Sequence, residues 1–307
     1  MTSYFSYYSS KCQEFLTDGG RHVSAKTHSD IIEIAQMIQN DLPRETILPC
    51  TGDWSANALD TCSLGSANAA IDLCASLLTM IDVGEHEFGV SGRHPIHWTK
   101  GCLRTTLRDQ FSPERTLAVD NPRIGKLFKA ENLSKIAGVK IRWTNNLANH
   151  LRLTDDDKAV FIFHHASFLK FQQSLTQQLF PPGFIEETLY TLALLFPQND
   201  SHTRRWIQTL GSPCLDQNIS RCGSLRAQDR RFDRFLFWHD RLVVLKQVFD
   251  DSSPRTLAQW WWDRRNGVQW YTFWVAVFVF LFTIFFGMVQ SVEGALQVYF
   301  SYKAQPG

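Results

Sequence analysis

Histidine and glutamate side chains crowd into one short segment of this sequence, where together they could bind a divalent metal ion. The members of the cluster are Glu85, His86, Glu87, His94 and His97. Imidazole and carboxylate groups are both metal ligands, but a zinc site normally needs a third or fourth ligand at a fixed position. Pro95 and two glycines make the spacing irregular. We therefore favour a polar turn, with His86, His94 and His97 as the candidate ligands of the alternative, and expect no cofactor.

A histidine pair, His164-His165, directly follows an apolar run at 159–163 that has the composition of a buried strand. Two adjacent imidazoles at the end of a strand could relay protons near neutral pH. The alternative is structural: one ring caps the next helix and the other is solvated. We favour this alternative, because such histidines are more often structural than catalytic. The sequence also contains neither a G-x-S-x-G motif nor a glycine-rich phosphate loop. The chain is therefore not expected to be an enzyme.

Four arginines recur at helical spacing near the end of the soluble region, at Arg226, Arg230, Arg234 and Arg241. Aspartates accompany them at positions 229, 233 and 240. Apolar residues at helical spacing predict one helix over 226–249, which would align the arginines along one side. We favour a ladder of solvated ion pairs. A surface for anionic lipid or for an acidic partner is the alternative.

One segment near the C-terminus, 268–290, contains no charged side chain and is long enough to cross the roughly 30 Å hydrocarbon core of a bilayer. It predicts a single transmembrane helix. Arg264 and Arg265 precede it, whereas Lys303 is the only basic residue in the tail 291–307. The positive-inside rule therefore predicts a cytosolic N-terminal body. The short tail predicts late insertion, as in a tail-anchored protein.

Aromatic and basic side chains gather just before this span. The predicted membrane-interface residues are Trp260, Trp261, Trp262, Arg264, Arg265, Trp270 and Tyr271. Indole rings favour the headgroup layer, because they combine an apolar body with a polar N–H. Within the span, Thr283, Gly287 and Ser291 recur at intervals of four, and small residues at that spacing allow two helices to approach closely. We therefore expect the lipid bilayer as one partner and a homodimer through this face.

The composition and the local patterns define the rest of the architecture. The 307 residues carry a net charge of +1, which gives no electrostatic argument for nucleic acid, so no nucleic-acid partner is expected, and the seven cysteines are expected to be reduced. We predict a mainly α body with a small β element. Predicted helices lie near 29–40, 55–81, 181–196, 201–210 and 226–249, and predicted strands near 139–143 and 159–163. The expected domains are a cytosolic body at 1–250, with a possible subdomain break near 160–180, an interfacial segment at 251–267, the span and the tail.

The C-terminal third carries the motifs WWDRRN at 261–266, QWYTFW at 269–274, FFG at 285–287 and EGALQVY at 293–299. These motifs resemble those of a family of filamentous-fungal membrane proteins without an established activity. The likeness extends upstream to GVSGRHPI at 89–96 and IFHHASF at 162–168. The resemblance implies a fungal origin and a membrane location.

A more distant resemblance is to the CorA-like magnesium channels, which also place long helices before a C-terminal membrane region. Their first span ends in Gly-Met-Asn, whereas this chain reads Gly287-Met288-Val289 and has no second apolar span. These departures argue against ion conduction. The expected function is thus that of a membrane-anchored interaction or accessory protein. The alternatives are a divalent-cation transport component and a membrane-associated enzyme or accessory factor of a fungal biosynthetic pathway.

Overall fold

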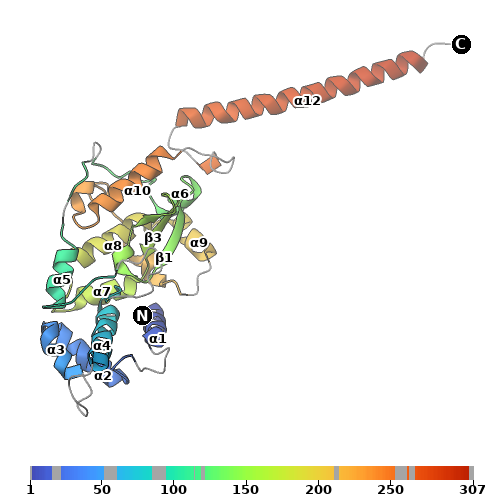
Figure 1. Cartoon of the computed structure of the whole chain (residues 1–307). Helices are drawn as coiled ribbons and strands as arrows, with labels where there is room; N and C mark the ends of the chain where they lie inside the picture. Colours follow the sequence, from blue (N-terminus) through green and yellow to red (C-terminus); the bar gives the residue numbers. More distant parts are fainter. Residues whose placement is uncertain are drawn as a thin grey trace. The chain divides into compact units, whose positions relative to one another are not determined.

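The structure, a computed structural model, describes residues 2–15, 22–51, 61–84, 95–113, 115–118, 122–210, 214–252, 261–262 and 267–303. The chain divides into two compact units, the body (Met1–Ser252) and the anchor unit (Ser253–Gly307). Helices dominate the body and surround one three-stranded sheet, while a long apolar helix makes up most of the anchor unit (Figure 1). The predicted fold class, a mainly α body with a small β element and one apolar C-terminal helix, is confirmed.

Four helices form the N-terminal part of the body and gather at one end of it in Figure 1. They are α1 (Thr2–Phe15), α2 (His28–Gln39), α3 (Arg44–Thr51) and α4 (Thr61–Thr79). The apolar residues in the middle of α4, among them Ala70, Cys74 and Ala75, are buried, and the helix packs against α1, α2 and α3. A capping box of Thr27 and Asp30 begins α2. The Thr27 hydroxyl accepts the N–H of Asp30 at 3.2 Å, and the Asp30 carboxylate accepts the N–H of Thr27 at 2.9 Å.

Two further helices, α5 (Leu103–Gln110) and α6 (Ala130–Lys135), lead to the sheet of β1 (Lys140–Thr144), β2 (Leu153–Thr154) and β3 (Ala159–Phe163). The 3-10 helix η1 (Leu147–Asn149) lies between β1 and β2. The strand order is β1-β3-β2, with β3 parallel to β1 and antiparallel to β2. Four of the five residues of β3 are buried, which explains its unbroken apolar sequence. Both strands predicted from the sequence are present.

The acidic run Asp155 to Asp157 forms the turn between β2 and β3. All three residues have positive φ values, of 57°, 52° and 63°, which aspartate tolerates better than most residues. The side chains are exposed, and Arg142 on β1 pairs with Asp155 at 2.5 Å. The run is therefore a solvated turn.

The chain after the sheet forms α7 (Ala166–Ser174), α8 (Phe184–Leu195), α9 (Ser201–Thr209), the 3-10 helices η2 (Gln217–Arg221) and η3 (Phe232–Arg234), and α10 (His239–Asp251). Ten of the twelve residues of α8 are buried, so this helix is part of the core. The carboxylate of Asp200 caps α9 by accepting the N–H of His202 at 3.1 Å. Ser201 is the first residue of the helix.

The predicted helix over 226–249 is wrong, because only its C-terminal half is helical. Residue Arg231 pairs with Arg123 in an isolated antiparallel bridge, and the Phe232 N–H donates to the Pro122 carbonyl at 2.9 Å. The buried carboxylate of Glu187 on α8 accepts the N–H groups of Leu236 and Trp238, each at 2.8 Å. These tertiary acceptors take N–H groups that a continuous helix would need for its own hydrogen bonds.

The anchor unit contains α12 (Gly267–Lys303), a helix of 37 residues with a mean hydropathy of 2.4 in its most apolar window. At about 1.5 Å per residue its length exceeds the thickness of a hydrocarbon core. None of its residues is buried, so it is not the core helix of a globular domain. The predicted span at 268–290 lies entirely within α12. In the part of the chain that the structure describes, α12 is the one helix long and apolar enough to cross a membrane.

Candidate functional site

A cluster of tryptophans lies at the start of the anchor helix. The Trp261 ring packs edge-on against the Trp274 ring, with 5.0 Å between the two centroids. The centroid of the Trp270 ring lies 6.2 Å from that of Trp274. The Trp270 indole N–H donates to the Trp261 carbonyl at 3.4 Å. Tyr271 packs against Trp270 at 5.1 Å, and its side chain is exposed, as that of Trp262 is. The contacts thus bring together Trp261, Trp270 and Tyr271 of the predicted interface set. Trp260, Arg264 and Arg265 lie outside the described residues.

The tryptophan cluster is expected to lie at the depth of the lipid headgroups, where amphipathic rings are favoured. In full-length protein reconstituted into vesicles, brominated lipids should therefore quench part of the tryptophan fluorescence. Replacement of Trp260, Trp261 and Trp262 by alanine should lower the quenched fraction. As a matched control, Trp206→Phe removes a tryptophan from α9 in the body and should not lower that fraction. Unchanged quenching in the triple variant would refute the interfacial assignment.

The small-residue face of α12 consists of Thr283, Gly287 and Ser291. The Thr283 hydroxyl donates to the Val279 carbonyl and the Ser291 hydroxyl to the Gly287 carbonyl, each at 2.9 Å. Both hydroxyls are thus satisfied within the helix, as a hydrocarbon environment requires. A side chain at Gly287 would meet no atom within 4 Å, so the face is open. Homodimer formation through this face stays a prediction.

The predicted metal ligands are not assembled in the described structure. His97 is exposed, while His86 and His94 lie outside the described residues. The described part of the chain contains no group of three or more histidine, cysteine or acidic side chains that could hold a metal ion. His97 instead lines a cavity of about 540 Å³ that Arg152 and Arg241 also line, so the neighbouring side chains are cationic.

The histidine pair after β3 is buried, with His164 only 3% and His165 only 1% exposed. The rings stack at 4.0 Å, and the Nε2 atoms of His164 and His165 lie 3.2 and 2.8 Å from the same Asn145 Oδ1. Because that oxygen only accepts hydrogen bonds, both rings donate from Nε2. The Asp216 backbone N–H donates to His164 Nδ1 at 3.3 Å. The prediction of one capping ring and one solvated ring was therefore wrong.

Asp216 performs the capping that was assigned to a histidine. Its carboxylate accepts the N–H of Ser167, in the first turn of α7, at 2.6 Å. Burial lowers the pKa of His164 to about 4, although Asp216 opposes the shift. Burial and the neighbouring His164 lower the pKa of His165 to about 2. Both rings are buried and share Asn145 as a hydrogen-bond partner, so the arrangement supports packing rather than proton relay.

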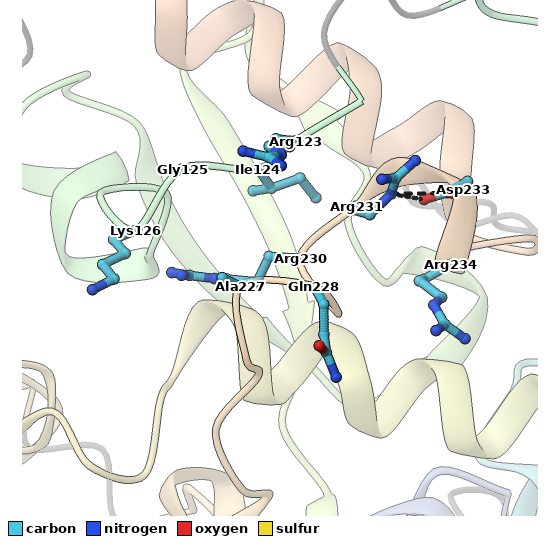
Figure 2. A pocket seen from close by; sticks show the side chains of 10 residues that line it. All are labelled: Arg123, Ile124, Gly125, Lys126, Ala227, Gln228, Arg230, Arg231, Asp233 and Arg234. Carbon is cyan, nitrogen blue, oxygen red and sulfur yellow. Dashed lines mark hydrogen bonds and ion pairs between the residues drawn. The ribbon is translucent and has the colours of Figure 1, made fainter.

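The cationic pocket is a cavity of about 880 Å³ between two segments that lie far apart in the sequence. Its lining residues are Arg123, Ile124, Gly125, Lys126, Ala227, Gln228, Arg230, Arg231, Asp233 and Arg234 (Figure 2). The Arg123–Arg231 bridge and a hydrogen bond from the Ile124 N–H to the Arg230 carbonyl, at 2.9 Å, hold the two segments together. The buried Ile124 gives the pocket an apolar element.

Charge is strongly unbalanced in this pocket. Five of its lining residues are cationic and one, Asp233, is acidic, although the whole chain has a net charge of only +1. Asp233 is already engaged by Arg231 at 3.0 Å. Figure 2 shows Arg231 facing Asp233, while the guanidinium of Arg230 extends toward the side where Lys126 lies. Among the described residues, Arg230 Nε is buried without a hydrogen-bond partner.

The structure separates the four arginines that the sequence placed on one helix. Arg230 and Arg234 line the cationic pocket, Arg226 is exposed and does not line it, and Arg241 reaches into the body. The predicted ion-pair ladder is therefore wrong. Sequence reasoning also missed Arg123 and Lys126, because nothing in their local spacing links them to residues 227–234.

Comparison with protein-family models, with curated proteins and with solved structures finds no match for this chain. Function is therefore inferred from the anchor helix, the buried polar groups and the cationic pocket.

Proposed function

We propose that this protein is a single-pass membrane-anchored interaction or accessory protein whose body faces the cytosol. The observation that carries the proposal is α12, a 37-residue helix with no buried residue and a mean hydropathy of 2.4 in its most apolar window. Burying such a helix in lipid removes a large apolar area from water. The orientation is supported by Arg264 and Arg265 before the span against Lys303 alone after it.

The two alternative functions have weaker support. Gly287-Met288-Val289 lies inside the continuous helix α12 and lacks the asparagine of the CorA-like motif. An enzymatic role would need a reactive group, and the two histidines that were candidates for proton relay are buried and neutral. The C-terminal motifs support membership of the fungal membrane-protein family, which is consistent with an anchored accessory protein.

Membrane integration is tested by alkaline carbonate extraction of membranes that contain the full-length protein. We expect the protein to stay in the pellet. Replacing Leu281 and Phe282 by arginine should release it, since each charge at a helix centre costs about 3 kcal/mol of insertion free energy. Proteolysis of intact membranes should digest the body. Release of the unmodified protein at alkaline pH, or a protected body, would overturn the anchor or its orientation.

An accessory role also requires a second protein. Affinity purification of the full-length protein in a mild detergent is therefore expected to retain a partner in a constant ratio. Recovery of this chain alone at every detergent concentration would argue against an accessory role, and would leave the membrane anchor intact as a separate conclusion.

A further inference from the structure

We propose that the cationic pocket binds a phosphate-bearing ligand, supplied either by a lipid headgroup or by a soluble phosphoester. This inference goes beyond membrane anchoring and does not depend on it. The pocket combines five cationic side chains with a cavity of about 880 Å³, which falls in the size range of small-ligand sites. A chain with a net charge of only +1 thus carries five cationic side chains at one concave place.

The type of cation favours phosphate over other anions. Four of the five cations are arginines, whose planar guanidinium groups bind phosphate oxygens through two parallel hydrogen bonds. Lys126 adds a mobile point charge from the opposite segment. A phosphate with three terminal oxygens can accept hydrogen bonds from several such groups at once, whereas one carboxylate can satisfy fewer of them.

One carboxylate stands against five cationic side chains in the lining of the pocket. Its single carboxylate, Asp233, is engaged by Arg231. Within the described residues, Lys126, Arg230 and Arg234 form no ion pair, and the buried Arg230 Nε has no acceptor. Like charges held close together repel, and a buried donor without an acceptor is unfavourable. A bound phosphate would remove both costs.

The backbone fixes the pocket before any ligand arrives. The Arg123–Arg231 bridge aligns the two segments, and the Phe232 N–H donates to the Pro122 carbonyl at 2.9 Å. A ligand therefore meets a formed site, which lowers the entropy cost of binding. The size of the cavity suits one headgroup or one small phosphoester, and a single pocket of this size is smaller than the extended basic face with which proteins usually bind nucleic acid.

The test uses the full-length protein in nanodiscs of phosphatidylcholine, with calorimetry as the readout. One arm titrates inorganic pyrophosphate, and the other titrates a short-chain phosphatidylinositol bisphosphate. Binding in both arms indicates recognition of phosphate itself, and binding in the second arm alone indicates a lipid headgroup; either result supports the proposal. Affinity should fall as the salt concentration rises. Absence of binding in both arms would overturn the proposal.

Substitutions locate the binding. Arg230→Gln and Lys126→Gln should each weaken binding about tenfold, since each removes a charge-assisted contact. Arg226→Gln makes the same charge change at an exposed neighbour outside the lining and should leave binding unchanged. Lys126 is exposed, so its substitution tests the site even if Arg230→Gln unfolds the body, which thermal unfolding would reveal. Equal affinity in all three variants would place the anion elsewhere and overturn the proposal.

Discussion

Acidification from pH 7 to pH 4.5 is expected to remove several kcal/mol from the free energy of unfolding of the body, because three histidines are buried in the neutral form. His150 is fully buried, and burial together with Arg241 lowers its pKa to about 3. The pKa values of His164 and His165 are lowered to about 4 and about 2. The usual histidine pKa is about 6.5.

The direction of the effect follows from proton uptake. Between pH 6.5 and pH 4 the unfolded chain binds a proton at each of these rings, whereas the folded body does not. Stability is therefore complete above pH 6.5 and is lost as the pH falls. Each ring contributes a slope of at most about 1.4 kcal/mol per pH unit, so a loss on the order of 5 kcal/mol is expected by pH 4.5.

Two carboxylates, those of Glu187 and Asp240, modify this slope at its acidic end. Burial raises the pKa of Glu187 above its usual range, so protonation of Glu187 favours the folded state as the pH falls and opposes the histidines. Hydrogen bonds with Thr116 and His239 outweigh burial at Asp240 and lower its pKa to about 2, so its contribution to stability is lost only as the pH falls below about 4. The histidines therefore dominate between pH 6.5 and pH 5.

Urea titration of the full-length protein in a mild detergent, followed by circular dichroism at several pH values, measures this slope. His150→Gln should reduce it by about one third, one ring of three. His202→Gln removes a histidine from the exposed start of α9 and should keep the slope. A free energy of unfolding that does not change between pH 7 and pH 5 would show that the rings are accessible to protons in the folded body, as a proton relay requires.

The helices and strands that could be predicted from the sequence are those in which an apolar pattern continues over several residues of one segment. The apolar run of β3, the stripe of α8 and the long span in α12 each contain several residues that indicate the same structure. The histidine pair could be located at the end of a strand. Its burial could not be predicted, because the shared acceptor Asn145 and the donor Asp216 come from other segments.

The cationic pocket and the segment before α10 could not be predicted for the same physical reason. Residues 226–238 have the composition of a helix, but their N–H groups find acceptors in Pro122 and Glu187, which are distant in the sequence. Local propensity is weaker than several such tertiary hydrogen bonds. An unpaired buried carboxylate at Glu187 would be costly, so these bonds determine the local structure.

Replacement of Arg241 is the second change with a large expected effect on the stability of the body. The structure gives Arg241 a role that Arg226, Arg230 and Arg234 lack. Its guanidinium donates to the carbonyls of Ala148 and His150, at 2.7 and 2.6 Å, and lies 5.2 Å from the Trp238 ring centre. Burial and the nearby Arg152 lower its pKa to about 10, so it stays charged at pH 7. Arg241→Met would leave both carbonyls without this donor and should destabilise the body by about 3 kcal/mol.

Two comparisons make this prediction specific. Arg241→Lys keeps the charge but not the planar group that reaches both carbonyls, so an intermediate loss is expected. Arg226→Met makes the same change at an exposed position and should alter stability by no more than about 0.5 kcal/mol. Equal losses of stability in Arg226→Met and Arg241→Met would support the predicted ladder of solvated ion pairs and contradict the structure. Because the charge of Arg241 helps to lower the pKa of His150, Arg241→Met should also make the acid dependence less steep. Urea titration at pH 7 measures the loss of stability, and the same titration at several pH values measures the change in slope that His150 and Arg241 share.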